Sequence, residues 1–179
     1  MNTNARTLAL VALLSPLATT AQADALPKEV QNLSCLDGTW TGTGTLAMGK
    51  QKVPLHFTWT CKSTAAKYGV VCDLDLTGIP GLAHYRETDL FGYEPNTRTY
   101  HWFSVTNGAE THDHVARLSN SNKIRFTYRG KQDGKPFREV IDWELLGKPD
   151  AEPTGIKLRS ESFVGNKSTS VMMAEATKR

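Results

Sequence analysis

Three of the chain's five histidines fall within one short segment, residues 99–117, where they could do chemistry. Imidazole nitrogens coordinate zinc and copper, exchange hydrogen bonds with ligands and move protons near neutral pH. A carboxylate in the same segment could complete a metal site or donate a proton. These residues are His101, His112, His114 and Glu110.

A β-hairpin would bring these side chains together. Asn107-Gly108, at the centre of the segment, is a strong signal for a two-residue type I′ turn, because both of its residues must tolerate positive φ. Counted outward from that turn, Phe103 lies opposite His112 and His101 lies opposite His114, on one face. His112 and His114 share a face in any register, since side chains alternate along a strand. His101 joins them only if the turn has an even number of residues.

The histidine face of the hairpin leaves four interpretations open. Its apolar members indicate that it points inward, where the histidines could bind the polar end of a small molecule, hold a metal, act in acid–base catalysis or have only a structural or solvated role. A catalytic interpretation uses His114 with Glu110, in an isomerase, cyclase or hydrolase. The metal interpretation assigns zinc or copper to His101, His112 and His114. The ligand-binding interpretation involves His101, Phe103, Glu110, His112 and His114.

Period-two alternation recurs along the chain after residue 36, and no window shows a long apolar stripe at helical spacing. Turn residues separate the alternating runs, as at residues 78–81, 133–134 and 165–166. These signals predict an all-β antiparallel meander of about ten strands, with a short helix possible within residues 26–33. Closure into a barrel removes the exposed edges, whereas a two-sheet sandwich would need longer crossover connections than this chain mostly offers.

The N-terminus predicts export. Arg6 precedes a short apolar run, residues 8–17, and Ala21-Gln22-Ala23 resembles a signal-peptide cleavage site. The run is too short to span a bilayer, although retention as an N-terminal anchor stays open. We expect a signal peptide over residues 1–23, a lead-in over 24–35 and one barrel domain over 36–179, located in the periplasm or outside the cell.

The charge balance excludes some classes of partner. The 179 residues include 21 basic and 18 acidic ones, and no basic run stands out. We therefore expect no nucleic-acid partner and no stable insertion into a membrane. A mature chain of this length suits a single domain with one core.

Export makes a disulfide between two of the three cysteines plausible, because disulfides persist in oxidising compartments. Cys61 and Cys72 flank a turn-like segment, residues 62–71, and would project from the apolar sides of neighbouring strands. This pair is the favoured disulfide, with Cys35 either free or paired instead with one of the two.

Two parts of the chain resemble known barrel families. Residues 36–44 are similar to the Gly-x-Trp-x-Gly-x-Gly opening of calycin-type barrels, which include lipocalins and nitrobindins. In such an opening, Trp40 can plug one end of the barrel while Gly42 and Gly44 let the first strand bend. Residues 90–97 and 171–177 resemble the bacterial domain-of-unknown-function family number 1579, which implies a barrel of about ten antiparallel strands and no particular activity.

The resemblance to nitrobindins does not extend to haem. Nitrobindins hold haem through a histidine near the C-terminus, whereas this chain has no histidine after His114 and has Met172 and Met173 in roughly that region. We expect no haem. The sequence favours an exported barrel that binds a small apolar or amphiphilic molecule, with a metal- or histidine-dependent enzyme as the alternative.

Overall fold

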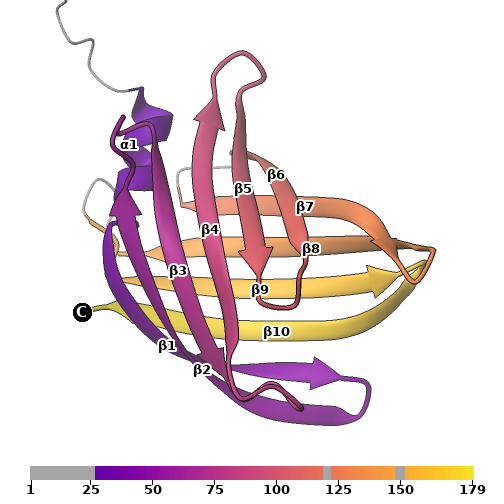
Figure 1. Ribbon diagram of the computed structural model, residues 1–179. Coiled ribbons are helices and arrows are strands. Elements are labelled where there is room, and N and C mark those ends of the chain that lie inside the picture. Colours follow the sequence, from indigo (N-terminus) through magenta and orange to yellow (C-terminus); the bar gives the residue numbers. More distant parts are fainter. Residues whose placement is uncertain (1–26, 119–121, 148–151) are drawn as a thin grey trace, which may run out of the picture.

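The protein is a closed barrel of ten antiparallel strands with one short helix at its end (Figure 1). The computed structural model describes residues 27–118, 122–147 and 152–179, so the expected signal peptide lies outside the described residues. The elements are α1 (Lys28–Ser34), β1 (Gly38–Met48), β2 (Gln51–Ser63), β3 (Gly69–Thr77), β4 (Tyr85–Glu94), β5 (Thr99–Thr106), β6 (Thr111–Leu118), β7 (Lys123–Gln132), β8 (Lys135–Leu146), β9 (Gly155–Val164) and β10 (Lys167–Lys178).

The strands follow one another around the barrel in chain order. Each strand pairs with its neighbours in sequence, and β1 pairs with β10 to close the ring. The prediction of an all-β meander closed into a barrel is therefore confirmed, and the two-sheet sandwich is excluded. The helix allowed by the sequence within residues 26–33 is α1, which ends one residue later. Among the described residues, no helix has the length and apolar character that crossing a membrane requires.

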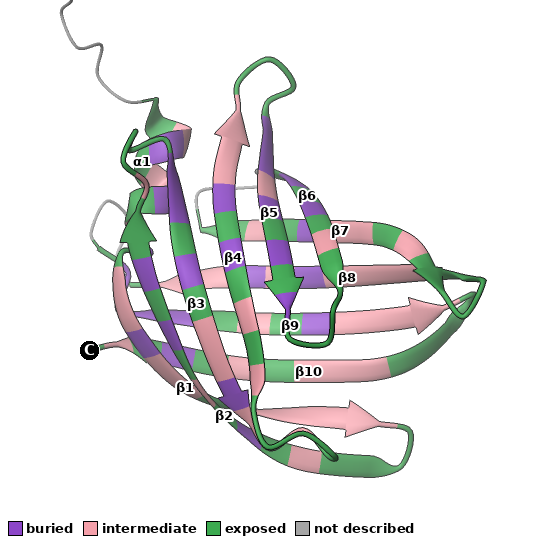
Figure 2. Cartoon of the chain, viewed as in Figure 1, coloured by how far each residue is buried: buried purple, intermediate pink, exposed green. Residues whose placement is uncertain are grey.

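The two ends of the barrel differ. Because the strands alternate in direction, the hairpins β1–β2, β3–β4, β5–β6, β7–β8 and β9–β10 all lie at the end opposite α1. At the α1 end, Val30 and Leu33 of the helix are buried, and Trp40 is fully buried with its indole N–H donating to the Leu36 carbonyl at 2.7 Å. Most buried residues gather toward this end, and the hairpin tips are exposed (Figure 2).

Glycines let β1 pass close to its neighbours, as the sequence predicts. A Cβ atom at Gly42 would lie 2.5 Å from the Glu175 carbonyl oxygen of β10, and one at Gly44 would lie 2.5 Å from the Met173 carbonyl oxygen. Either contact is far inside normal van der Waals distance, so the approach of β1 to β10 requires residues without a side chain.

The predicted Cys61–Cys72 disulfide is confirmed and joins β2 to β3. The two residues face each other directly in the strand register, with their Cα atoms 4.0 Å apart and both side chains buried. Cys35 is free, and its thiol donates to the Asn32 carbonyl at 2.8 Å. Burial raises the pKa of the Cys35 thiol to about 11, so this thiol is a poor nucleophile at neutral pH.

The disulfide provides the first testable prediction. It closes a loop between residues 11 apart in sequence, and loss of such a constraint on the unfolded chain typically costs about 2–4 kcal/mol of unfolding free energy. We expect Cys61→Ser/Cys72→Ser to lower the denaturant midpoint and to abolish its sensitivity to reductant. Cys35→Ser is the control and should retain that sensitivity; equal midpoints for the double variant and the native chain would contradict the prediction.

Candidate functional site

The β5–β6 hairpin has a different register from the one that its sequence predicts. The loop contains three residues, Asn107 to Ala109, with Ala109 at a φ of 60°, and the Thr106 amide donates to the Glu110 carbonyl at 3.0 Å. Ser104 consequently lies opposite His112, and Trp102 lies opposite His114. The predicted pairs, Phe103 with His112 and His101 with His114, are wrong by one residue.

This one-residue shift exchanges the inward and outward faces of β5, because side chains alternate along a strand. His101 is on the outside of the barrel, where its Nδ1 lies 3.1 Å from Asp113 Oδ1. Phe103 and Val105 are also outside, 43% and 46% exposed. The expectation that His101 and Phe103 join His112 and His114 on the inner face is therefore wrong. Trp102 and Ser104 take their places and are buried.

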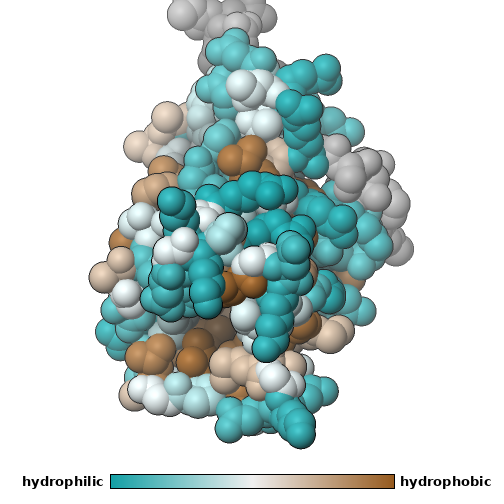
Figure 3. Space-filling model, turned by 90° about the vertical axis from the view of Figure 1, so that its right-hand side faces the viewer, coloured by the Kyte–Doolittle hydropathy of each residue, from teal (hydrophilic) through white to brown (hydrophobic). Residues whose placement is uncertain are grey.

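A cavity of about 280 Å³ occupies the half of the barrel away from α1. Its walls are mainly apolar, and its lining includes residues next to the β1–β2, β3–β4, β5–β6, β7–β8 and β9–β10 hairpins. Figure 3 shows the molecule from the right-hand side of Figure 1. In this view, apolar atoms are visible at the bottom of a hollow between polar side chains. The apolar part of the wall includes Leu46, Leu55, Phe57, Trp59, Leu74, Leu76, Ile79, Trp102, Phe137, Ile141, Leu158, Met172 and Ala174.

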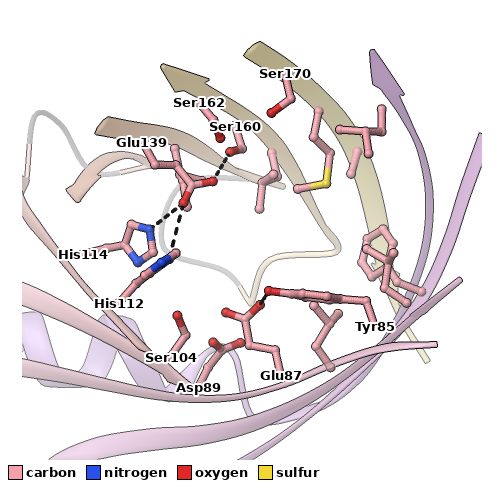
Figure 4. Close-up of a pocket in the computed structure, with 18 of the residues that line it drawn as sticks. Tyr85, Glu87, Asp89, Ser104, His112, His114, Glu139, Ser160, Ser162 and Ser170 are labelled. Carbon is pink, nitrogen blue, oxygen red and sulfur yellow. Dashed lines mark hydrogen bonds and ion pairs between the residues drawn. The ribbon is translucent and has the colours of Figure 1, made fainter. Parts of the chain in front are cut away.

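One wall of the cavity carries two histidines and a glutamate (Figure 4). His114 Nε2 lies 3.0 Å from Glu139 Oε2, and His112 Nδ1 lies 3.9 Å from the same oxygen. The other oxygen of Glu139 accepts a hydrogen bond from Ser160 at 2.6 Å. The Tyr128 ring stacks on the His112 ring with the centroids 4.1 Å apart. The histidine wall, defined as His112, His114, Glu139 and Ser160, is thus held from three strands, β6, β8 and β9.

The charge on Glu139 results from two opposing effects. Burial alone would raise the pKa of this carboxyl group, because a charge is poorly solvated inside the barrel. Hydrogen bonds from His114 and Ser160 favour the carboxylate form, and they lower the pKa below its usual value. Glu139 is therefore an anion at neutral pH, and the histidine wall presents it to the cavity.

The opposite wall, defined as Tyr85, Glu87 and Asp89 of β4, carries two carboxyl groups (Figure 4). Asp89 is completely buried and accepts hydrogen bonds from the indole N–H groups of Trp102 at 2.5 Å and Trp59 at 3.0 Å. Tyr85 donates to Glu87 at 2.8 Å. Burial, together with the charge and hydrogen bonding of neighbouring Glu87, raises the pKa of Asp89 well above its usual value. Folding therefore favours the neutral, protonated form of Asp89.

Two buried polar atoms of the cavity wall have no hydrogen-bond partner among the described residues. They are Ser104 Oγ and His114 Nδ1, on side chains that are 1% and 2% exposed. Buried polar atoms are normally satisfied. Ser104 lies directly opposite His112, which is two residues from His114 on the same face of β6. The two atoms, Ser104 Oγ and His114 Nδ1, therefore belong to the same region of the wall.

Sequence reasoning identified only part of this site. Of the predicted residues, His112, His114 and Glu110 line the cavity, and the acid next to His114 is Glu139, not Glu110. Glu139 and Asp89 were missed. The sequence did hold a signal for each, because Glu139 shares its strand face with Phe137 and Ile141, and Asp89 shares its face with Phe91. A carboxylate within an apolar alternating series is a candidate for a buried site.

The fold defines the class of the protein, a closed ten-stranded antiparallel barrel, and comparison with solved structures supports it. The crystal structure of Rv2717c from M. tuberculosis matches with a TM-score of 0.62 and 12% identity, over 87% of this chain and 99% of that chain. Comparison with protein-family models found no match, so the resemblance to calycins and to family number 1579 stays a prediction. Comparison with curated proteins found no match either. The likeness to Rv2717c is one of fold alone.

The raised pKa of Asp89 gives the second testable prediction. Since its pKa is raised on folding, unfolded Asp89 loses its proton near pH 4 while the folded residue retains it. The stability that Asp89 contributes is complete below that pH and declines as the pH rises, by up to about 1.4 kcal/mol per pH unit. We expect the unfolding free energy of the native chain, minus that of Asp89→Asn, to fall from pH 4 upward.

Denaturant titrations at several pH values measure this difference. The control is Asp133→Asn, at the exposed tip of the β7–β8 hairpin. Its unfolding free energy should change with pH in parallel with that of the native chain. Parallel curves for the native chain and Asp89→Asn would show that Asp89 has the same pKa in both states.

Proposed function

We propose that the protein is exported and binds a small, mostly apolar molecule in the hollow half of its barrel. The cavity is the observation that carries this proposal: about 280 Å³ of space with an apolar wall and two polar clusters. Small-molecule sites have this character, although this cavity is slightly smaller than the usual range and so fits a small ligand. Export is supported by the Cys61–Cys72 disulfide, which persists in oxidising compartments.

The way into the cavity is from the hairpin end. At the other end, the rings of Trp59, Phe91, Trp102 and Trp143 lie with centroids 5.1–6.4 Å apart and fill the barrel. A ligand therefore inserts its apolar body past the hairpins until it reaches these rings.

The charges on the cavity wall restrict the polar group of the ligand. Four carboxyl groups line the cavity, those of Glu87, Asp89, Glu110 and Glu139, and none of its described lining residues is a lysine or arginine. A ligand carboxylate would find no permanent cation and would face carboxylates in a poorly solvated space. A hydroxyl or amine can instead bond with Ser104 Oγ or the carboxyl groups. We therefore assign to the cavity a ligand with a neutral or cationic polar group.

Three ligands of equal chain length test this assignment: 1-octanol, octylamine and octanoate. Tryptophan fluorescence reports binding, because Trp59 and Trp102 line the cavity. In metal-free buffer we expect octanol and octylamine to bind at least about tenfold more tightly than octanoate, a difference of about 1.4 kcal/mol. Octanoate binding as tightly as the other two would contradict the proposed ligand class.

A pair of neighbouring substitutions tests whether binding occurs inside the barrel. Ala174 of β10 lines the cavity, and Met173 beside it is 58% exposed on the outside. We expect Ala174→Phe to weaken octanol binding by tenfold or more, since the ring fills cavity space, and Met173→Phe to leave it unchanged. Thermal unfolding confirms that both variants fold. Equal affinities for the two variants would place the ligand elsewhere and refute the proposed function.

A further inference from the structure

The donor atoms of the histidine wall converge on one point. One ligating atom from each of His112, His114 and Glu139 lies within 4.8 Å of the others. Around a tetrahedral zinc ion, with bonds of about 2.0–2.2 Å, neighbouring ligand atoms are about 3.4 Å apart. The distances from Glu139 Oε2 to His114 Nε2 and His112 Nδ1, 3.0 Å and 3.9 Å, lie on either side of that value.

The three side chains are held in place by contacts that leave these donor atoms facing one another. Ser160 binds Glu139 Oε1 and so leaves Oε2 to the two histidines. Tyr128 stacks on His112, and Trp102 lies against His114 with the ring centroids 5.1 Å apart. Contacts of this kind orient the ligands of metal sites and reduce the cost of assembling them.

We propose that His112, His114 and Glu139 bind a zinc ion. Two imidazoles and one carboxylate form a donor set that zinc accepts, with three protein ligands and a fourth position that stays open. All three residues line the cavity, so the fourth position faces it and is filled by water or by a polar atom of a bound molecule. The positive ion also offsets the carboxyl groups of a cavity whose described lining contains no lysine or arginine.

This site goes beyond the proposed function, because it needs no organic ligand. It also replaces the metal set that the sequence predicts. His101 is outside the barrel beside Asp113, and Glu139 from β8 takes its place.

Zinc titration of the full-length, untagged chain, stripped of metal with a chelator that is then removed, tests the proposal. We expect one zinc ion per chain by calorimetry and by competition with a chromophoric chelator. Glu139→Gln and His112→Ala should each weaken binding by tenfold or more. His101→Ala is the matched control: it removes a histidine from the same hairpin, on the outer face, and should leave the affinity unchanged. Cobalt(II) substitution provides a second measurement, since the intensity of its visible absorption reports a four-coordinate site.

Two outcomes would overturn the proposal. One is zinc binding by the native chain that is no tighter than binding by His112→Ala/His114→Ala. The other is an equal loss of affinity in His101→Ala, which would move the site to the surface. Because His114 is buried, Glu139→Gln and His112→Ala carry the test if His114 variants fail to fold, and their folding is checked by thermal unfolding. Octanol binding, measured without metal, is a separate result, so either proposal can fail while the other stands.

Discussion

The hydrogen bonds that Asp89 accepts from two tryptophans join the packed half of the barrel to the hollow half. Trp59 and Trp102 contact Phe91 and Trp143 and also form part of the cavity wall. A buried indole N–H without an acceptor costs about 1–3 kcal/mol. The two rings can face the barrel interior because a single carboxyl group satisfies both of them. Beyond Asp89, toward the hairpins, the cluster of Trp59, Phe91, Trp102 and Trp143 ends and the cavity begins.

Local patterns in the sequence were sufficient to predict the fold. Alternating side chains and short turns indicate the strands one at a time, and closure follows because an antiparallel meander with short connections otherwise leaves two open edges. The Cys61–Cys72 disulfide could also be predicted, since both residues lie on the apolar faces of consecutive strands. These inferences need only sequence neighbours. The resulting barrel has the predicted strand order throughout.

The signal from the turn was not sufficient to predict the register of β5. Asn107-Gly108 suggests a two-residue turn, but Ala109 adopts a positive φ and extends the loop to three residues. The longer loop places Tyr100 and Trp102 inside the barrel, whereas the shorter one would bury Phe103 and Val105. The chain buries the larger pair of side chains, which removes more apolar surface from water. Comparing the two faces of β5 by size would have favoured the observed register over the signal from the turn.

The histidine wall shows what sequence alone could not supply. His112 and His114 share a face on strand geometry, but Glu139 reaches them from β8, with β7 between the two strands. The β6–β7 ladder pairs only Val115 to Leu118 of β6 with residues of β7. The segment of β6 that bears His112 and His114 therefore faces the Tyr128 ring and Glu139 without a ladder partner on β7 among the described residues. The contact between Glu139 and the two histidines depends on where the β6–β7 ladder ends. The spacing of residues in the sequence does not reveal that position.

The histidine wall and the opposite wall of the cavity each bury a carboxyl group, but by different means. The difference determines which of the two carboxyl groups suits a cation. The pKa of Asp89 is raised by burial, which favours its neutral form, and both of its oxygens already accept indole hydrogen bonds, so it has little capacity for a metal. Glu139 remains an anion, and its Oε2 faces two imidazoles. An ion at the histidine wall can replace the hydrogen bond from His114 without uncovering any other buried group, because Ser160 continues to bind Oε1. At Asp89 the same ion would displace the proton and leave two tryptophan N–H groups competing with it. The zinc ion that we propose therefore fits the histidine wall better than Asp89, and Glu87 on the opposite wall remains available to the hydroxyl or amine of an organic ligand.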